Sequence, residues 1–177
     1  MTRSGEAVTL GTTQGPFTLV VVDGAVIASG WTEDAGQLLA GVHPSLRPDA
    51  LATVSGADRT GDDVLARAVA AVRAYDARTD LHAPVGVPVR AVGGAFREAA
   101  WRALRGVAPG TRVTYAELAA LAGRPRAVRA AGSACATNPV PLFVPCHRVV
   151  RSDGTLGGFA YGLGLKRHLL DAEAASG

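Results

Sequence analysis

Residues 138–150 read Asn-Pro-Val-Pro-Leu-Phe-Val-Pro-Cys-His-Arg-Val-Val, and this stretch is the most informative part of the chain. Pro145 fixes its own φ angle, so the backbone that enters Cys146 is stiff. The apolar run before it predicts that the thiol lies on a buried wall. An imidazole that takes up the thiol proton would turn Cys146 into a thiolate nucleophile. The pair Cys146-His147 alone leaves a buried structural cysteine equally open, because adjacent side chains of an extended chain point in opposite directions.

The residues before this stretch predict two helices joined by a short turn. Thr114 is suited to cap a helix over residues 115–122, with Glu117 at the third position as in a capping box. Gly and Pro within residues 123–125 end that helix, and a second helix is expected from about 126 to 137. This is the arrangement of a helix-turn-helix, although many such pairs touch no DNA. Three arginines on or beside the second helix favour DNA binding: Arg124, Arg126 and Arg129.

The remainder of the second half is also expected to be mainly helical. Residues 93–107 predict a helix with three large residues on its apolar side: Phe96, Trp101 and Leu104. Asp153-Gly154 predicts a turn. The glycines of residues 157–162 predict a loop that permits close approach of a flat ligand. A last helix is expected over residues 163–173.

The first half of the chain predicts a small sheet with helices. Alternating apolar residues predict strands at 8–13, 17–23 and 25–31, and Asp23-Gly24 is a strong hairpin signal between the last two. Helices are expected over about 33–40 and from Asp62/Asp63 to near Tyr75, with a loop over 43–62 between them. Residues 81–92, with Pro84 and Pro88, predict an extended connector, and the domain boundary is placed there.

Composition and charge limit the classes of protein that remain. The chain has 177 residues, enough for one domain or two small ones, and its hydrophobic content of 48% is ample for a core. Residues 1–89 carry six arginines against ten acidic residues, whereas residues 90–177 carry twelve basic residues against five acidic ones. This asymmetry favours a polyanionic partner for the second half, with ordinary surface bias as the alternative.

Several kinds of segment and site are not expected from the sequence. No apolar stretch predicts a transmembrane helix, and residues 1–6 do not resemble a signal peptide. Cys135 and Cys146 are therefore interpreted as reduced thiols. The histidines are scattered and show no zinc spacing, so neither a metal nor another cofactor is expected. We expect a cytoplasmic, bacterial-type protein without an obligate protein partner, a monomer in solution that joins the nucleoid on DNA.

Taken together, these motifs resemble the O6-alkylguanine-DNA alkyltransferases, also called methylated-DNA–protein-cysteine methyltransferases. The resemblance rests on the 138–150 stretch, on Val113 to Ala119, on Arg129, and on Gly157 to Glu173 with Lys166. It implies an α+β fold. A small N-terminal ribonuclease-H-like α/β domain over 1–88 would precede a C-terminal helical winged helix-turn-helix domain over 89–177. It also implies repair of double-stranded DNA by irreversible transfer of an alkyl group from O6 of guanine, with O4 of thymine as a further candidate.

The resemblance implies a role for each catalytic residue. Cys146 would accept the alkyl group in a single turnover, after the nucleotide is flipped out through the minor groove. His147 would receive the thiol proton through a bound water, and Glu173 would orient the imidazole. Tyr115 would donate a hydrogen bond to the departing base, and Asn138 would act as a hinge between the recognition helix and the active-site segment.

The resemblance also implies two sets of binding residues. Arg129 would fill the gap left by the flipped base, and the other residues implied at the DNA are Arg126, Ala130 and Thr114. The expected substrate pocket comprises Val144, Pro145, Val149, Gly157, Phe159 and Ala160. Small residues of the second helix would let it enter a narrow groove, although they equally suit tight packing on a neighbouring helix. Phe159 and Ala160 stand where many relatives carry tyrosine and serine, so the pocket is expected to keep its aromatic face and lose hydroxyls.

Two other functions remain open on the sequence. An alkyltransferase-like protein would bind flipped damaged bases without reacting, but those relatives lack the acceptor cysteine that Cys146 supplies here. A cysteine hydrolase would use the same thiol and base but has no need of a helix-turn-helix. A change of protein mass on reaction with alkylated DNA distinguishes these three functions.

Overall fold

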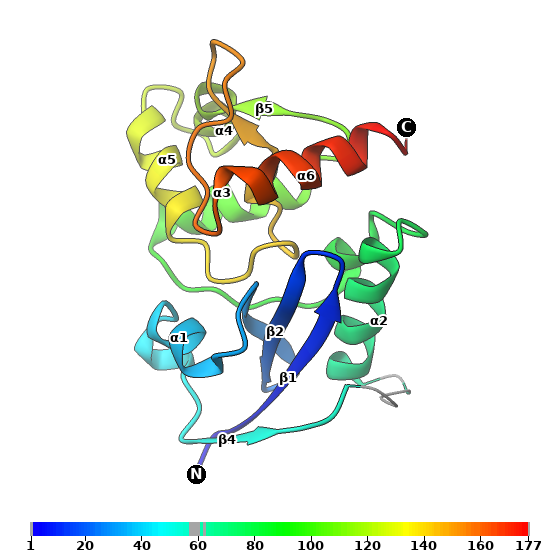
Figure 1. The fold of residues 1–177 in the computed structure, drawn as a ribbon. Helices are drawn as coiled ribbons and strands as arrows, with labels where there is room; N and C mark the ends of the chain where they lie inside the picture. Colours follow the sequence, from blue (N-terminus) through cyan, green and yellow to red (C-terminus); the bar gives the residue numbers. More distant parts are fainter. Residues whose placement is uncertain (1, 57–60, 62, 177) are drawn as a thin grey trace. The chain divides into compact units, whose positions relative to one another are not determined.

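The computed structural model describes residues 2–56, 61 and 63–176 (Figure 1). Contacts group the chain into two compact units, Met1–Val92 and Gly93–Gly177, and each is described by itself. The sequence places the boundary at residue 88, within the connector, whereas the units divide after residue 92. The mixed α+β fold class is confirmed, because one unit is built on a sheet and the other on helices. The ribonuclease-H-like and winged descriptions of the two units stay predictions.

The first unit contains a four-stranded sheet in the order β3-β2-β1-β4. Strands β1 (Ser4–Thr12), β2 (Gly15–Val22) and β3 (Ala25–Gly30) form an antiparallel meander. The predicted hairpin at Asp23-Gly24 is confirmed, with φ angles of 48° and 71°. Both values are positive, as a two-residue hairpin turn that matches the twist of its strands requires.

Strand β4 (Ala50–Thr53) corrects the expectation of a loop over residues 43–62. It pairs parallel with β1 at the edge of the sheet, and a short 3₁₀ turn η1 (Pro44–Leu46) precedes it. Its Ala-Leu-Ala-Thr sequence has little strand propensity, so the pairing partner rather than the local sequence specifies it. Asp62 lies outside the described residues, whereas Asp63 caps the following helix as predicted and accepts a hydrogen bond from the Ala66 amide at 2.8 Å.

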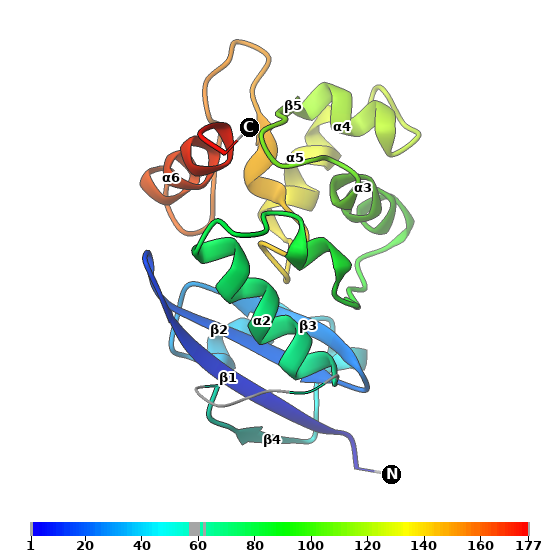
Figure 2. The same cartoon turned by 90° about the vertical axis from the view of Figure 1, so that its right-hand side faces the viewer.

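Helices α1 (Ala35–Ala40) and α2 (Val64–Asp76) cover opposite faces of this sheet (Figures 1 and 2). Successive side chains of a strand point to opposite faces of the sheet, so each strand contributes residues to both faces. Ala7 pairs with Val20, and both side chains join the cluster that α1 covers through Leu38. Val8, which is also buried, points to the other face. The predicted connector over residues 81–92 contains one 3₁₀ turn, η2 (Ala83–Gly86).

The second unit arranges its helices around the segment that carries Cys146. Its elements are α3 (Ala95–Arg105), β5 (Val113–Thr114), α4 (Tyr115–Leu121), α5 (Val128–Ala136), the 3₁₀ turn η3 (Cys146–Arg148), β6 (Val149–Val150) and α6 (Leu163–Ala174). Figure 2 shows α3, α4 and α5 grouped together, with α6 on the other side of η3. Parallel pairing of β5 with β6 brings the first residue of α4 to the end of the Cys146 segment.

The predicted helix-turn-helix corresponds to α4 and α5. The capping box is confirmed, because the Thr114 hydroxyl accepts from the Glu117 amide at 3.1 Å and the Glu117 carboxylate accepts from the Thr114 amide. On α5, Ala131 and Ala134 are fully buried. The indole of Trp101 on α3 donates to the Ala134 carbonyl at 2.9 Å. The small residues of this helix face therefore serve tight packing against α3.

Within the described part of the chain, no helix has the length and apolar character needed to cross a membrane.

Candidate active site

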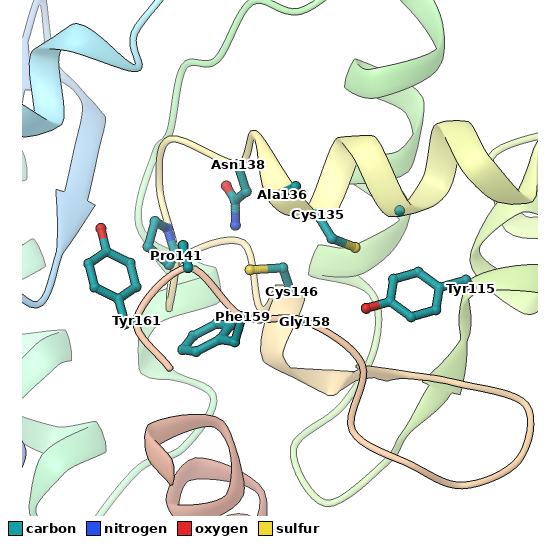
Figure 3. A pocket seen from close by; sticks show the side chains of 11 residues that line it. Tyr115, Cys135, Ala136, Asn138, Pro141, Cys146, Gly158, Phe159 and Tyr161 are labelled. Carbon is teal, nitrogen blue, oxygen red and sulfur yellow. The ribbon is translucent and has the colours of Figure 1, made fainter. Parts of the chain in front are cut away.

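A cavity of about 350 Å³ opens within the second unit, and Cys146 lies on its wall (Figure 3). Five segments line it: the start of α4, one face of α5, the loop after α5, the η3 turn with Cys146, and the loop before α6. The lining residues are Tyr115, Gly132, Cys135, Ala136, Asn138, Pro141, Cys146, Gly158, Phe159, Ala160 and Tyr161. The walls are mainly apolar and aromatic, as is usual for a site that holds a flat organic ligand.

A tight turn presents the Cys146 thiol to this cavity. Residues 146–148 form η3, and the Cys146 amide donates to the Val144 carbonyl at 2.8 Å. The Cys146 side chain is buried, with only 7% of the residue exposed. Cys146 faces the cavity, whereas the next side chain, His147, is directed into the protein interior toward Glu173. The structural interpretation of an isolated buried cysteine does not account for this arrangement.

Asn138 connects the end of α5 to the segment that carries Cys146. Its side-chain amide donates to the Val144 carbonyl at 2.8 Å, and its oxygen accepts from the Val140 amide at 3.0 Å. The same side chain also forms a hydrogen bond with the Cys146 thiol. Asn138 thus holds the backbone on both sides of the proline-rich loop and contacts the sulfur itself (Figure 3).

Behind the cavity wall, His147, Arg148 and Glu173 form a buried polar cluster. The His147 Nε2 atom lies 2.7 Å from Glu173 Oε1. The Arg148 guanidinium donates through Nε to both carboxylate oxygens, at 3.2 and 3.0 Å, and through a second nitrogen to Oε1 at 2.9 Å. The Gly110 amide donates to Oε2 at 3.2 Å. All three side chains are at most 1% exposed, so water does not screen these charges.

The pKa directions in this cluster follow from burial and pairing. Burial lowers the pKa of His147, although its hydrogen bond to Glu173 opposes that effect. Burial alone would raise the pKa of Glu173, but hydrogen bonds from His147 and Arg148 outweigh it and hold that pKa well below its ordinary value. At neutral pH the carboxylate is therefore ionised and the imidazole neutral, with its proton on Nε2 toward Glu173.

Lys166 of α6 is a second buried cation beside the cavity. Its ammonium group donates to three backbone carbonyls, those of Val149 at 2.6 Å, Leu156 at 2.5 Å and Gly158 at 3.1 Å. Three acceptors match the three N–H donors of a charged ammonium group. Through these bonds Lys166 ties the loop that carries the cavity wall to β6.

The Cys146 thiol is protonated at rest. Burial raises the pKa of Cys146, and the Asn138 hydrogen bond and the Lys166 charge only partly offset it. Burial likewise raises the pKa of the nearby Cys135 to about 12. Both thiols are neutral at physiological pH, so nucleophilic attack by Cys146 requires a group that removes its proton.

Tyr115 directs its hydroxyl toward the interior of the cavity (Figure 3). Burial and the two cysteines raise its pKa, whereas Arg151 and the Gly158 amide lower it. The phenol therefore stays protonated and is able to donate a hydrogen bond to a ligand.

Comparisons with known proteins agree with this geometry. The family model described as 6-O-methylguanine DNA methyltransferase, DNA binding domain, matches residues 95–175, which include the whole cavity and the buried cluster. The structure resembles the crystal structure of O6-methylguanine methyltransferase from Mycobacterium tuberculosis with a TM-score of 0.76 and 27% identity, over 98% of this chain and 94% of that one. Over residues 95–175 the chain is therefore similar to the 6-O-methylguanine DNA methyltransferases.

Further proteins are similar to this chain over different lengths. A second structure from Mycobacterium tuberculosis, in complex with DNA, matches with a TM-score of 0.76 and 27% identity over 97% of this chain and 94% of that one. The bifunctional transcriptional activator/DNA repair enzyme Ada of Escherichia coli is 47% identical over 91 residues, 51% of this chain and 26% of that protein. The methylated-DNA–protein-cysteine methyltransferase of Haemophilus influenzae is 46% identical over 87 residues, 49% of each chain. The aligned part thus spans half or less of these curated relatives.

The pocket residues inferred from the family resemblance are only partly those that line the cavity. Phe159 and Ala160 do line it. The other four do not, and they lie behind or beside its wall: Val144, Pro145, Val149 and Gly157. Gly157 has a φ of +71° and lies against the Tyr115 hydroxyl, so its part is to leave room for that side chain.

Sequence reasoning missed several lining residues. On α5 these are Gly132, Cys135 and Ala136, which share one helix face at spacings of three and four residues. That spacing was a usable signal, because the segment that follows α5 carries Cys146. Pro141 and Tyr161 lie in loops, where no periodicity points to a cavity.

The residues predicted at the DNA lie on or near α5, and their roles stay predictions. Arg129 is exposed in the first turn of α5. Arg126 is exposed in the turn before α5, because the helix begins at Val128 and not at residue 126 as expected. Ala130 is half-buried, and the Thr114 hydroxyl is engaged as the cap of α4.

The described residues contain no group of three or more His, Cys, Asp or Glu side chains arranged to hold a metal ion.

Proposed function

We propose that this protein repairs double-stranded DNA by transferring an alkyl group from O6 of guanine to Cys146, once per molecule. The observation that carries the proposal is the Cys146 thiol on the wall of an aromatic-lined cavity of about 350 Å³. Proteins named methylated-DNA–protein-cysteine methyltransferase share 46–48% identity over the corresponding part of the chain, which supports the same chemistry here. O4 of thymine is a second candidate donor.

The proposed reaction is a direct displacement at carbon. The thiol proton passes through a bound water to His147, the new sulfur–carbon bond forms, the carbon–O6 bond breaks, and its electron pair goes to the guanine. Tyr115 donates a hydrogen bond to the departing base and stabilises the developing charge. The thioether is stable and no group in the cavity hydrolyses it, so the protein is consumed in a single turnover.

The raised pKa of Cys146 makes a base necessary, and His147 is suited to be that base. The imidazole is neutral at rest and is held by an ionised carboxylate, Glu173, that stabilises it once protonated. Transient charge separation between sulfur and imidazole then occurs beside Lys166, whose positive charge favours the thiolate.

Guanine O6 faces the inside of a duplex, so the nucleotide has to be flipped out at a cost of a few kcal/mol. We propose that α5 lies in the minor groove, where readout is degenerate and suits a search for lesions in any sequence. Arg129, exposed at the start of this helix, would occupy the vacated place in the stack. No cofactor takes part, and the protein would act as a monomer in the cytoplasm, on the nucleoid.

The test is the intact mass of the protein after incubation with duplex DNA that contains O6-methylguanine. The mass is expected to rise by one methylene group, and peptide mapping is expected to find the methyl group on Cys146. Cys146→Ala should bind the lesion and gain no mass, whereas Cys135→Ala, the matched control in the same cavity, should react. Methyl transfer in the Cys146→Ala variant would exclude the proposed nucleophile.

Two outcomes would support the other functions. Lesion-specific binding with no change of mass in the wild type would indicate a non-reactive alkyltransferase-like protein. Repeated turnover of an ester or peptide would indicate a cysteine hydrolase.

A further inference from the structure

Among the residues that the structure describes, Arg148 is the largest fully buried side chain, and the proposed reaction gives it no role. Three of its hydrogen bonds go to the two oxygens of Glu173, and a fourth goes to the Val107 carbonyl at 2.5 Å. Burying an arginine is costly unless every charge around it is compensated. Its fixed fork of donors matches a carboxylate in two-point contact, which lysine does not.

The charges of the buried cluster balance only when His147 is neutral. Glu173 contributes one negative charge and Arg148 one positive charge, both essentially out of contact with water. A proton on His147 would leave a net positive charge in this interior. Lys166, which acts on the same ring, would increase the repulsion. Without Arg148, by contrast, the ionised carboxylate would face the imidazole alone and would stabilise its protonated form.

We propose that Arg148 is a positioning residue that keeps His147 unprotonated in the resting protein, by compensating the charge of Glu173 and fixing both of its oxygens. The inference rests on the proposed function, because it explains why the base is available to take the Cys146 proton at neutral pH. A histidine–glutamate pair by itself would hold the proton before the thiol could release it.

Three charged side chains act on the His147 ring. Glu173 and Lys166 belong to α6, and Arg148 follows the histidine in η3. During the reaction the S–H proton of Cys146 moves to the imidazole, so the cluster becomes cationic as the sulfur becomes anionic. This proton transfer creates an ion pair, and the attraction between thiolate and imidazolium offsets part of the cost of placing the two charges in the interior.

The direct test is the ¹⁵N NMR titration of His147 in the full chain without DNA. The signal is assigned by its loss in His147→Asn. In the wild type we expect a neutral ring with its proton on Nε2 at pH 7 and throughout the range in which an exposed histidine titrates. An imidazolium at pH 7 would overturn the proposal without any further variant.

Two substitutions separate charge from packing. Arg148→Met removes the charge with little change in length, and the titration midpoint of His147 should rise by at least about one pH unit. Arg148→Lys keeps the charge, and the midpoint should stay near that of the wild type. Arg105→Met, a half-buried arginine on α3 that donates to the Phe143 carbonyl, is the matched control and should not move it.

If Arg148→Met does not fold, Arg148→Gln carries the same test, since it keeps an amide donor in place of the guanidinium. A midpoint that is the same in the wild type and in the uncharged variant would refute the role. The titration does not depend on alkyl transfer, so failure of the proposed function and failure of this inference are distinguishable.

If the protein transfers alkyl groups, the pH dependence of the transfer rate provides a second test. With free O6-benzylguanine as the substrate, the acidic limb of the pH–rate profile should shift to higher pH in Arg148→Met. In Arg148→Lys it should keep its wild-type position. A purely structural role would lower the rate equally at every pH.

Discussion

The Gly157 backbone lies directly against the Tyr115 hydroxyl, so that a β-carbon at position 157 would stand 2.6 Å from that oxygen. The φ angle of +71° at Gly157 separately disfavours any side chain. The glycine therefore fixes where the phenol points, and this contact links the loop before α6 to the first residue of α4.

Gly157→Ala should displace Tyr115 as well as strain the backbone. We expect a backbone cost of about 1–2 kcal/mol in unfolding free energy, together with a fall in alkyl-transfer rate of about tenfold or more. Gly154→Ala is the matched control, because Gly154 has a φ of +84° and nothing within 4 Å of an added β-carbon. The alkyl-transfer rate under single-turnover conditions and the unfolding free energy in urea are measured for both variants. Equal rates in the two variants would show that the phenol position is not what matters.

Asn138→Ala should lower the unfolding free energy and make the Cys146 thiol less acidic. The buried Val140 amide loses its partner and the Val144 carbonyl loses one of its two donors, which should cost about 1–3 kcal/mol. The pKa of Cys146 should rise further, because one of the hydrogen bonds that favour its thiolate is removed. Urea unfolding and the iodoacetamide rate at pH 8 measure the two effects. Thr137→Ala, which removes only an exposed bond to the Ser133 carbonyl, should change neither appreciably.

Lys166→Met should loosen the cavity wall and remove a positive charge from beside Cys146. Three backbone carbonyls lose their donor, so we expect a loss of about 2–4 kcal/mol in unfolding free energy. The pKa of Cys146 should also increase, since the Lys166 charge lowers it in the wild type. Arg167→Met, on the exposed side of the same helix, is the control. An unchanged thiol titration in Lys166→Met would exclude the electrostatic role.

Acidification should destabilise the second unit in two steps. The folded-state pKa values of His147 and Glu173 both lie below their ordinary values, so the unfolded chain binds more protons. Stability is then complete above about pH 7 and is lost as the pH falls, first below about 6.5 through His147 and then below about 4.3 through Glu173. The slope should not exceed about 1.4 kcal/mol per pH unit for each group.

This pH dependence can be followed through Trp101 fluorescence in a Trp31→Phe background, because Trp101 belongs to the second unit. His147→Gln should abolish the first step, whereas His43→Gln, at an exposed position of the first unit, should leave it intact. Stability that rises on acidification would contradict the neutral imidazole.

Arg129→Ala should separate DNA engagement from chemistry. Arg129 is exposed, so unfolding free energy should change by less than about 0.5 kcal/mol. Transfer from duplex DNA should fall while reaction with free O6-benzylguanine stays near wild type. The exposed Arg102 of α3 supplies a control with the same loss of charge. Equal losses on both substrates would refute the proposed place of Arg129 in the base stack, and DNA affinity that does not decrease with salt would count against phosphate contacts.

Much of the local structure could be predicted because short-range chemistry dictates it. The Asp23-Gly24 hairpin, the Asp63 cap and the Thr114–Glu117 capping box each depend on residues a few positions apart. Strand β4 could not be predicted in the same way. Its four residues have no strand signature of their own, and only their pairing with β1, more than forty positions earlier in the chain, makes them a strand.

The residues of the candidate site divide in the same way, into those that the local sequence predicts and those that only tertiary contacts specify. Residues in the motif around Cys146 were identifiable, since their types and spacing are unusual. Lys166 and Arg148 were seen only as parts of a motif, because nothing local indicates that a cation is buried or which carbonyls it meets. Their contacts run to Val107, Leu156 and Glu173.

The sequence by itself determined which groups are available: a thiol after a rigid proline, an imidazole beside it, and helices that end where their caps dictate. Only the tertiary structure decided the protonation of those groups, because that depends on burial and on charges brought together from distant segments. The η3 turn sends the Cys146 thiol into the cavity and the His147 ring to Glu173, 26 positions away. In water the same residues would be an ordinary cysteine and an ordinary histidine. Enclosed with Arg148 and Lys166, they form a neutral imidazole and a protonated thiol.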